Sequence, residues 1–373
     1  MKIQRFGPVA AIALAGSLVL SACGSDDNSA DIAAAGGGST DGSSVECAEG
    51  TLSAEGSSAQ KNAIEEAIAS FQTVCDGATV NYNPTGSGAG IKQFIAGQVD
   101  FAGSDSALKT EEKDGKVESV EAEKHCGSPA WNLPMVTGPI AVSYNLPGVN
   151  RLILTPEVIA NIFNGKVKAW NDASIAALNP GAKLPSTPVK VFFRSDESGT
   201  TENFTKYLAA AAPKAWTAEP GKSWTGKGEG KEKSSGVASA VKATEGGITY
   251  AEWSYAKDNK LGIAEVDNGS GPVQLNGESV GNAVAIAEQE GEGNDLRLKL
   301  DYATKEPGAY PILLVTYEIV CSKSDDPKQA ALTKAFLKHF SSQKTQSSLE
   351  EIGYAPLPDE VRTKVDAAID ALS

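Results

Sequence analysis

Three segments of this chain pass from an apolar run directly into a cluster of Gly, Ser and Thr that begins a helical pattern. The clusters lie at Gly56–Ala59, Thr85–Gly90 and Arg194–Thr200. The first N–H groups of a helix have no partner within the helix, and the helix dipole places partial positive charge there. One such cluster alone is more often an ordinary N-cap. Three of them, together with Arg194 and Asp105, predict a single oxyanion enclosed from several sides.

The first 22 residues have the pattern of a secretory signal peptide. Lys2 and Arg5 precede a short apolar core at Val9–Leu20, which is too short to span a bilayer as a stable helix. The following Leu20–Cys23 has the form of a bacterial lipobox, in which Cys23 is acylated, for example with palmitate, and becomes the new N-terminus. Ordinary cleavage beside a chance Cys is the alternative. Two or three acyl chains would anchor the chain durably to the outer face of the cell membrane.

Residues 23–46 predict a flexible tether. After the lipidated Cys, the segment Gly24–Glu46 is rich in Gly, Ser, Asp and Ala, with no aromatic residue and one isolated Ile32. Such a segment cannot bury enough apolar surface to fold. As a flexible coil it would have a mean reach of roughly 25–30 Å. We therefore expect a globular domain held just outside the membrane.

The charge of the chain limits its partners. The formal net charge is −14, and removal of residues 1–22 takes away Lys2 and Arg5 and no acid, so the mature chain would carry −16. Nucleic acid is not expected as a partner of so acidic a protein. An anion would have to be bound by local dipoles and one or two cations. About 325 residues follow the tether, which is too long for one ordinary core and predicts two domains.

Four cysteines remain once Cys23 is assigned to lipid, an even number that suits an oxidising compartment: Cys47, Cys75, Cys126 and Cys321. Three pairings are open. Cys47–Cys75 with Cys126–Cys321 is favoured, because the first closes a short loop and would contribute about 3 kcal/mol. A metal site is the alternative, but the chain has no CxxC spacing and only two His. We therefore expect no metal and no cofactor.

Short β-prone runs alternate with helical patterns along the mature chain. Strands are predicted at Thr79–Tyr82, at Val99–Ala102 and at Lys190–Phe193. Arg194 follows directly after the last of these strands. This alternation favours a parallel sheet with right-handed crossovers. Residues 213–236 lack periodicity and are predicted to be a surface loop.

Further elements are expected on either side of that loop. Residues at helical spacing predict one buried helix face: Ile64, Ala67, Ile68, Phe71 and Val74. Additional strands are predicted at Pro139–Tyr144 and Pro311–Val320, and Thr155 is expected to cap a helix that begins with Pro156.

Several segments in fixed order resemble the substrate-binding lipoproteins of Pst-type phosphate ABC importers, in their actinobacterial form. The segments that carry the resemblance are Gly86–Ile91, Phe101–Ser106, Tyr144–Val149, Trp170–Asp172, Ala176–Gly181, Arg194–Asp196, Ser198–Thr200 and Gly353–Pro358. The resemblance covers most of the mature domain. It implies an α/β, two-lobed, periplasmic-binding-protein-like (type II) fold, in which each lobe is a central mixed sheet flanked by helices. We expect residues 47–140 plus 307–373 to form lobe I and residues 141–306 to form lobe II.

The resemblance also implies a set of phosphate contacts: Ser58, Ala59, Ser87, Asp105, Arg194, Ser198, Gly199 and Thr200. Hydroxyl and backbone N–H groups in this set are donors, and the Arg194 guanidinium offers a planar fork to two oxygens. Asp196 is expected to pair with Arg194 and orient it. At the position of Ala59 the family often has a bulkier residue. For this position the resemblance therefore implies only that the backbone N–H contacts the phosphate.

Asp105 is the unusual member of this set, because a carboxylate should repel an anion. Phosphate that still carries a proton can donate it to Asp105, whereas fully ionised sulfate cannot. Sites built around one hydrogen bond can reject a ligand that lacks the donor by about 10⁴–10⁵-fold. We therefore expect Asp105 to select phosphate over sulfate.

The resemblance implies a receptor that binds inorganic phosphate outside the cell and delivers it to the membrane permease of an ABC importer. Its lobes would close by a hinge near Gly138–Val142 and residues 305–310, and a monomer is expected. The alternatives are a binding protein for molybdate, tungstate or sulfate, and a secreted phosphatase. The Asp105–Ala107 segment faintly resembles the nucleophile motif of alkaline phosphatases, but that chemistry needs two zinc ions and several His or Asp ligands. With two His in the chain, we expect no enzyme.

Overall fold

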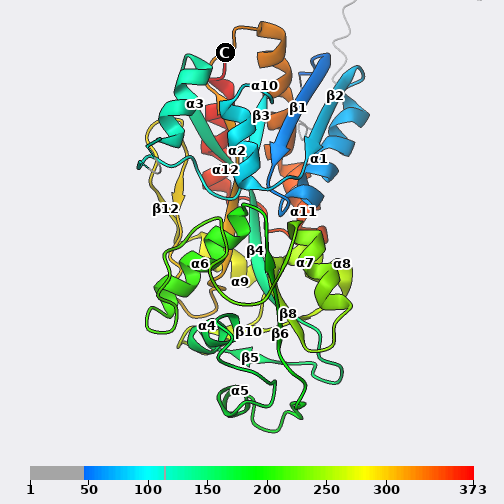
Figure 1. Cartoon of the computed structure of the whole chain (residues 1–373). Helices are drawn as coiled ribbons and strands as arrows, with labels where there is room; N and C mark the ends of the chain where they lie inside the picture. Colours follow the sequence, from blue (N-terminus) through cyan, green and yellow to red (C-terminus); the bar gives the residue numbers. More distant parts are fainter. Residues whose placement is uncertain (1–45, 113–114) are drawn as a thin grey trace, which may run out of the picture. The chain divides into compact units, whose positions relative to one another are not determined.

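The computed structural model describes residues 46–112 and 115–373 (Figure 1). The predicted signal peptide, the predicted lipidation site Cys23 and all but the last residue of the predicted tether lie outside the described residues. In the described part of the chain, no helix has both the length and the apolar character needed to cross a membrane.

One sheet runs through the described domain along a continuous path of hydrogen-bonded strands. In spatial order these are β2 (Ala78–Asn83), β1 (Gly50–Gly56), β3 (Phe101–Ser104), β14 (Leu313–Cys321), β4 (Ala130–Tyr144), β8 (Gly247–Glu252), β6 (Lys190–Arg194) and β7 (Glu229–Lys231), with β9 (Gly262–Ile263) paired to β4. Strands β2, β1 and β3 are parallel, as are β8, β6 and β7, while β14 and β4 are antiparallel to their neighbours. The predicted parallel pattern therefore holds at both ends of a mixed sheet.

The 15-residue strand β4 joins the two halves of this sheet. Its residues 130–139 pair with β14, and residues 140–144 pair with β8. The expectation from sequence covered only Pro139–Tyr144. The strand begins nine residues earlier because a bulge opposite Thr316 and Tyr317 accommodates the segment around Pro134.

Helices flank the sheet and fill the ends of the domain (Figure 1). They are α1 (Lys61–Val74), α2 (Ser87–Ile95), α3 (Glu118–Cys126), α4 (Pro156–Phe163), α5 (Ala173–Leu178), α6 (Gly199–Ala211), α7 (Lys233–Lys242), α8 (Trp253–Asn259), α9 (Gly277–Val284), α10 (Pro327–Ser341), α11 (Gln343–Ile352) and α12 (Asp359–Asp370). Two small sheets complete the described elements: β5 (Ile153–Leu154) with β10 (Glu265–Asp267) and β11 (Pro272–Val273), and β12 (Glu288–Gln289) with β13 (Leu298–Lys299).

Local sequence signals explain where several helices begin. Thr155 caps α4 by accepting a hydrogen bond from the N–H of Val158, and Pro156 is the first helical residue, as predicted. The predicted buried face of α1 is wrong at Val74, which is 54% exposed. Cys75, four residues after Phe71, takes the buried position at the end of that face, at 1% exposure.

The expectation that residues 213–236 form a surface loop is wrong in part. The segment contains β7, which extends the sheet beside β6, and the start of α7. Its Trp216 is 2% exposed and packs 5.3 Å, centroid to centroid, from Trp224. Trp224 in turn lies 5.2 Å from the Tyr250 ring. Aromatic contacts between distant residues of this kind do not recur at a fixed spacing in the sequence. The hydrophobic pattern of residues 213–236 therefore did not predict them.

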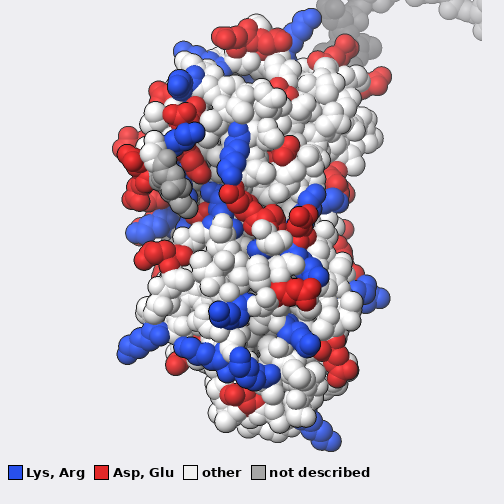
Figure 2. Space-filling model, viewed as in Figure 1, with Lys and Arg blue, Asp and Glu red and all other residues white. Residues whose placement is uncertain are grey.

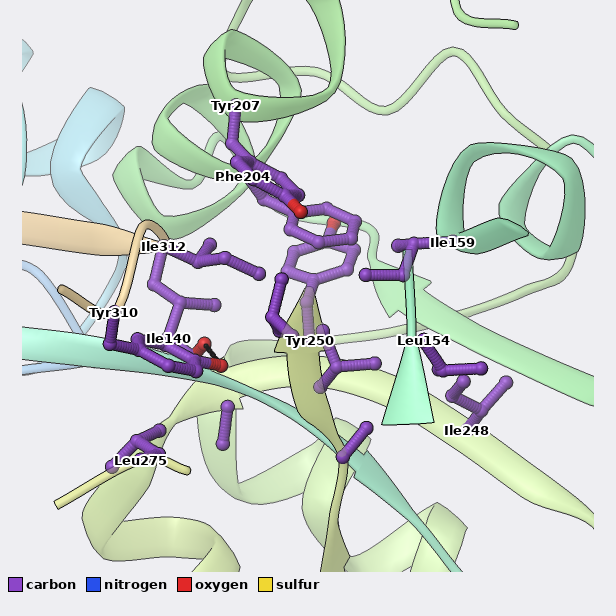
Figure 3. Packing of buried hydrophobic residues seen from close by; sticks show 14 of the residues in the cluster. Ile140, Leu154, Ile159, Phe204, Tyr207, Ile248, Tyr250, Leu275, Tyr310 and Ile312 are labelled. Carbon is purple, nitrogen blue, oxygen red and sulfur yellow. Dashed lines mark hydrogen bonds between the residues drawn. The ribbon is translucent and has the colours of Figure 1, made fainter. Parts of the chain in front are cut away.

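Two large apolar cores lie at opposite ends of the domain. One draws most of its residues from positions 140–314, and there the rings of Phe204 and Tyr250 stack with centroids 4.4 Å apart (Figure 3). At its edge the hydroxyl of Tyr310 donates to the carbonyl of Ile140 over 2.9 Å. The other core draws on Leu296 and on residues within 52–136 and 320–372, and its aromatic contacts join Phe71, Phe101 and Phe336. The lobe boundaries at 140/141 and 306/307 stay a prediction.

The structure joins Cys47 to Cys75 and Cys126 to Cys321, which confirms the favoured pairing. The first disulfide fastens the start of the described chain to the end of α1, and the second connects α3 with β14. Within residues 46–112 and 115–373, the one group spaced like metal ligands is His125 with Cys126 and Cys321. Both sulfurs are in the disulfide, so they are not thiolate ligands.

Candidate anion-binding site

The three Gly, Ser and Thr clusters begin helices α1, α2 and α6, as predicted, and backbone hydrogen bonds join them. The N–H of Gly86 donates to the carbonyl of Gly56 over 2.7 Å, which connects the second cluster to the first. The N–H of Gly88 donates to the carbonyl of Glu197 over 3.0 Å, which connects the second cluster to the third. The positive ends of three helices therefore lie together.

Arg194 lies at the end of β6 and is 2% exposed. Its Nε donates to Oδ1 of Asp196 over 2.7 Å, and its Nη2 donates to the other oxygen of the same carboxylate. Its Nη1 donates to the hydroxyls of Thr200, over 3.4 Å, and Ser234, over 3.1 Å. The guanidinium is thus held on one edge by a carboxylate and directed by the other edge toward hydroxyl groups.

The pairing of Arg194 with Asp196 determines the charge of both groups. Burial lowers the pKa of the Arg194 guanidinium, but the hydrogen bonds and charge of Asp196 outweigh burial and raise the pKa above its ordinary value. Burial likewise raises the pKa of Asp196, and Arg194 then reverses the shift, so that the pKa is lowered. The N–H of Lys233 also donates to Asp196 over 3.0 Å. Both groups are therefore charged at neutral pH.

The first cluster presents Ser58, which is 2% exposed, toward the start of α7. Its hydroxyl lies 3.2 Å from the hydroxyl of Ser234 and accepts the N–H of Ser234 over 3.1 Å. The N–H of Ala59, expected to face an anion, donates instead to the hydroxyl of Ser57 over 3.0 Å. Carbonyls of this turn accept from buried phenols: Tyr255 bonds the carbonyl of Ser58 and Tyr354 that of Ala59, each over 2.6 Å.

Asp105 follows β3 and is 3% exposed. Its carboxylate accepts from neutral hydroxyls: Thr316 donates to Oδ1 over 2.9 Å, and Thr200 donates to Oδ2 over 3.3 Å. Its N–H donates to the hydroxyl of Ser87 over 3.1 Å. Burial raises the pKa of Asp105, while the hydroxyl groups and the charge of Arg194 oppose that rise without cancelling it. Asp105 is thus a buried carboxylate that forms no direct ion pair with any residue of the described ranges.

Gly199, the first residue of α6, lies against the start of α2 and the residue that follows β3. A Cβ at this position would come within 2.5 Å of the Ser87 hydroxyl and 2.6 Å of the Asp105 Cβ. Ser198 caps α6 by accepting the N–H of Thr201 over 3.1 Å. The N–H groups of Gly199 and Thr200 have no acceptor among the described residues, as expected for a first helical turn. They are therefore available as anion donors.

The structure brings the predicted phosphate contacts and Asp196 into this one region, and it adds two residues that the sequence reasoning missed. Ser234 lies at the start of α7 and bonds both Arg194 and Ser58. The sequence signal was present, because Ser234–Gly236 is another Ser and Gly cluster at a helix start, inside the segment predicted as a loop. Thr316 was detectable only as a polar residue within the apolar run of β14.

Beside the site, three lysines surround a second buried carboxylate, that of Glu202. Glu202 on α6 lies 3.3 Å from Lys222, 3.2 Å from Lys206 and 3.8 Å from Lys109, and it accepts the hydroxyl of Ser106 over 3.0 Å. Burial raises the pKa of Glu202, but the lysines, Lys222 foremost, lower it to about 2. Basic and acidic side chains mix across the middle of the face drawn in Figure 2 rather than forming patches of one sign.

Known proteins share this sequence and fold. The pattern of the PBP superfamily domain matches residues 41–344. The phosphate-binding protein PstS 3 of Mycobacterium tuberculosis is 46% identical over the full length of both chains, and that of Mycobacterium leprae is 43% identical, also over both full lengths.

Solved structures share the fold at lower identity. A high-affinity periplasmic phosphate-binding protein bound with phosphate aligns with a TM-score of 0.67 at 20% identity, over 85% of this chain and 93% of that one. A phosphate-binding protein from Stenotrophomonas maltophilia aligns with a TM-score of 0.62 at 18% identity, over the same shares.

These relatives are named as binding proteins and not as enzymes, in agreement with the expectation from sequence. At full-length identity above 40%, the resemblance seen in the motifs extends to the whole chain. The chain belongs to the PstS family of phosphate-binding proteins, within the PBP superfamily.

Proposed function

We propose that this chain binds inorganic phosphate outside the cell and delivers it to the permease subunits of an ABC importer. The observation that carries the proposal is the position of the Asp105 carboxylate, buried among three helix N-termini and in the same cluster as Arg194. An arrangement of donors alone would suit any oxyanion. A carboxylate among them suits an oxyanion that still carries a proton.

Each predicted contact has a role in this proposal. The helix-start groups of Ser58, Ala59, Ser87, Ser198, Gly199 and Thr200 donate to phosphate oxygens, and Arg194 supplies the positive charge. Since the N–H of Ala59 donates to Ser57 in this structure, its contact requires a small local rearrangement on binding. Asp196 orients Arg194, and Ser234 supports Arg194 and Ser58 from α7.

Asp105 discriminates between phosphate and sulfate in this proposal. An ionised Asp105 accepts the O–H of monobasic or dibasic phosphate, whereas sulfate would bring lone pairs against lone pairs in a site closed to water. Unpaired polar groups in such surroundings cost several kcal/mol. The same cost disfavours sulfate, molybdate and tungstate as ligands of this site.

The proposal includes how the protein is placed in the cell. Acylation at Cys23 would hold the domain at the outer face of the membrane, and residues 23–46 would give it reach. Two lobes, 47–140 with 307–373 and 141–306, would close on the ion about a hinge near Gly138–Val142 and residues 305–310. The protein would act as a monomer that meets the permease.

Native mass spectrometry of the purified protein tests the proposal. A chain that keeps its ligand through purification should lose one phosphate equivalent after mild unfolding. An Arg194→Met variant, which removes the one buried cation of the site, should be purified without it. Release of sulfate or of no anion from the wild-type protein, followed by no binding of added phosphate, would refute the proposal. Turnover of p-nitrophenyl phosphate with divalent metals would favour a phosphatase instead.

A further inference from the structure

Near the candidate site is a buried carboxyl group that has no role in the interactions described above. Glu318, within β14, is 0% exposed. Neither of its carboxyl oxygens has a hydrogen-bond partner within the described ranges. The side-chain oxygen of Gln60 is also buried and has no partner in the same part of the chain. Buried polar atoms without partners are rare, and each one needs a physical explanation.

Strand register places these two groups side by side. Glu318 lies directly opposite Gly103 in the antiparallel ladder of β14 and β3, so its side chain is on the face where a Gly103 side chain would be. A Cβ on Gly103 would lie 1.9 Å from Nε2 of Gln60 and 2.6 Å from the Tyr82 hydroxyl. The absent side chain of Gly103 thus makes room for Gln60 and Tyr82 beside the Glu318 carboxyl.

From Gln60 a chain of hydrogen bonds leads to the first helix-start cluster. Nε2 of Gln60 donates to the Tyr82 hydroxyl over 3.0 Å, and that hydroxyl donates to the carbonyl of Ser57 over 2.8 Å. The hydroxyl of Ser57 in turn accepts the N–H of Ala59 over 3.0 Å. The position of the Ser57–Ala59 turn therefore depends on the orientation of the Gln60 amide.

The protonation state of Glu318 decides that orientation. A neutral acid has an O–H that Oε1 of Gln60 can accept, which gives a partner to one carboxyl oxygen and to the Gln60 oxygen, whereas a carboxylate would face Oε1 as a second acceptor. The titratable groups around Glu318 are Asp105, after β3, and Tyr82, on β2, while its partner on β4 is the apolar Leu133. Burial raises the pKa of Glu318 to about 8, with a smaller contribution from the charge of Asp105, against the opposing influence of the nearby Gln60 amide.

We propose that Glu318 is a positioning residue for the anion site: as a neutral acid it donates to Gln60 and holds the Ser57–Ala59 turn, and its ionisation opposes anion binding. This inference rests on the proposed function. A negative charge on Glu318 would lie in the same dry region as Asp105 and the bound anion. Because coupling between sites is reciprocal, anion binding would also raise the affinity of Glu318 for its proton.

Calorimetry with inorganic phosphate tests the inference in the full mature chain between about pH 6.5 and about pH 9.5. Glu318→Gln keeps a neutral donor, so at the lower pH its Kd should stay within about twofold of the wild-type value. At the higher pH the wild-type Kd should exceed that of the variant by about tenfold or more. The ratio of the two Kd values cancels the titration of phosphate itself. Glu265→Gln changes a partly buried glutamate on β10 that pairs with Arg151; it is the matched control, and its Kd ratio to the wild type should not change with pH.

The two proposals fail in different ways. A wild-type protein that binds no phosphate at any pH would overturn the proposed function. Binding with a pH-independent ratio between wild type and Glu318→Gln would overturn only the role of Glu318. A second measurement needs no ligand: at neutral pH the infrared absorption of protonated buried carboxyl groups, to which the buried Glu252 can also contribute, should be weaker in Glu318→Gln than in the wild type. Identical absorption in the two proteins would also refute the role of Glu318.

Discussion

The hydroxyl of Thr316 donates a 2.9 Å hydrogen bond to Oδ1 of Asp105, although the two residues are 211 positions apart in the chain. Thr316 lies in β14, which pairs with β3, the strand that ends just before Asp105. A central strand of the sheet thus holds the carboxylate that the proposal assigns to the phosphate O–H. This bond leaves the other carboxylate oxygen, Oδ2, with the weaker 3.3 Å bond from Thr200.

Removing the Thr316 hydroxyl should therefore weaken phosphate binding. Thr316→Val retains the shape of the side chain and takes away a hydrogen bond to a charged group, so the Kd should rise by about 10-fold to 100-fold. Thr316→Ser keeps the hydroxyl and should stay within about threefold of the wild type. Calorimetry at neutral pH measures both. An unchanged Kd in Thr316→Val would show that the bond does not position Asp105.

Gly199 should not tolerate a side chain. In Gly199→Ala the new methyl group would lie 2.5 Å from the Ser87 hydroxyl and 2.6 Å from the Asp105 Cβ, so the start of α6 must move away from β3. We expect phosphate affinity to fall by at least about 100-fold, because misplaced donors lose their geometry. Gly281→Ala is the control: it lies within α9 with nothing within 4 Å of the added Cβ. That variant should bind normally and be slightly more stable.

Stability at low pH should depend on Glu202. Its pKa, about 2, is depressed relative to the ordinary 4.5, so the folded state binds fewer protons than the unfolded state between these values. The stabilisation from Glu202 is therefore present above about pH 4.5 and is lost as the pH falls toward 2, by roughly 3 kcal/mol at most.

Urea unfolding as a function of pH measures the contribution of Glu202. In Glu202→Gln the free energy of unfolding should fall less steeply between about pH 4.5 and pH 2 than in the wild type. Glu229→Gln, from a surface pair with Lys231 whose acid is 65% exposed, should leave that slope unchanged. An equally steep fall in Glu202→Gln would contradict the assignment.

The two disulfides should differ in their contribution to stability. Cys126–Cys321 closes a separation of 195 residues and Cys47–Cys75 one of 28 residues. Loop-closure entropy then predicts that replacing both cysteines of Cys126–Cys321 by Ser lowers the free energy of unfolding by about 5 kcal/mol. The same replacement at Cys47–Cys75 should lower it by about 3.5 kcal/mol. Chemical denaturation of the two double variants gives the order directly. A larger loss on removing the shorter loop would show that native contacts, and not loop closure, determine the difference.

The sequence predicted those parts of the site that depend on local chemistry. The starts of α2 and α6 followed from Gly and Ser clusters, because the need for unhindered backbone at a helix N-terminus is visible within a few residues. Arg194 and Asp196 are two positions apart and pair as expected.

The rest depended on contacts between distant segments. Ser234 bonds Ser58 across 176 positions, and Thr316 bonds Asp105 across 211, and neither distance leaves a local pattern. The full length of β4 was missed for a related reason. Pro134 lowers the expectation of a strand, and only the bulge against β14 makes room for it.

The most direct test of the central claim is paired calorimetry of phosphate and sulfate on the wild-type protein and on Asp105→Asn. The account predicts one phosphate per wild-type chain and at least about 10⁴-fold weaker sulfate binding. Asparagine supplies an N–H that sulfate can accept, so in the variant that gap should shrink by at least about 100-fold. A gap of the same size in both proteins would contradict the account, because the carboxylate of Asp105 would then have no part in recognising the ligand.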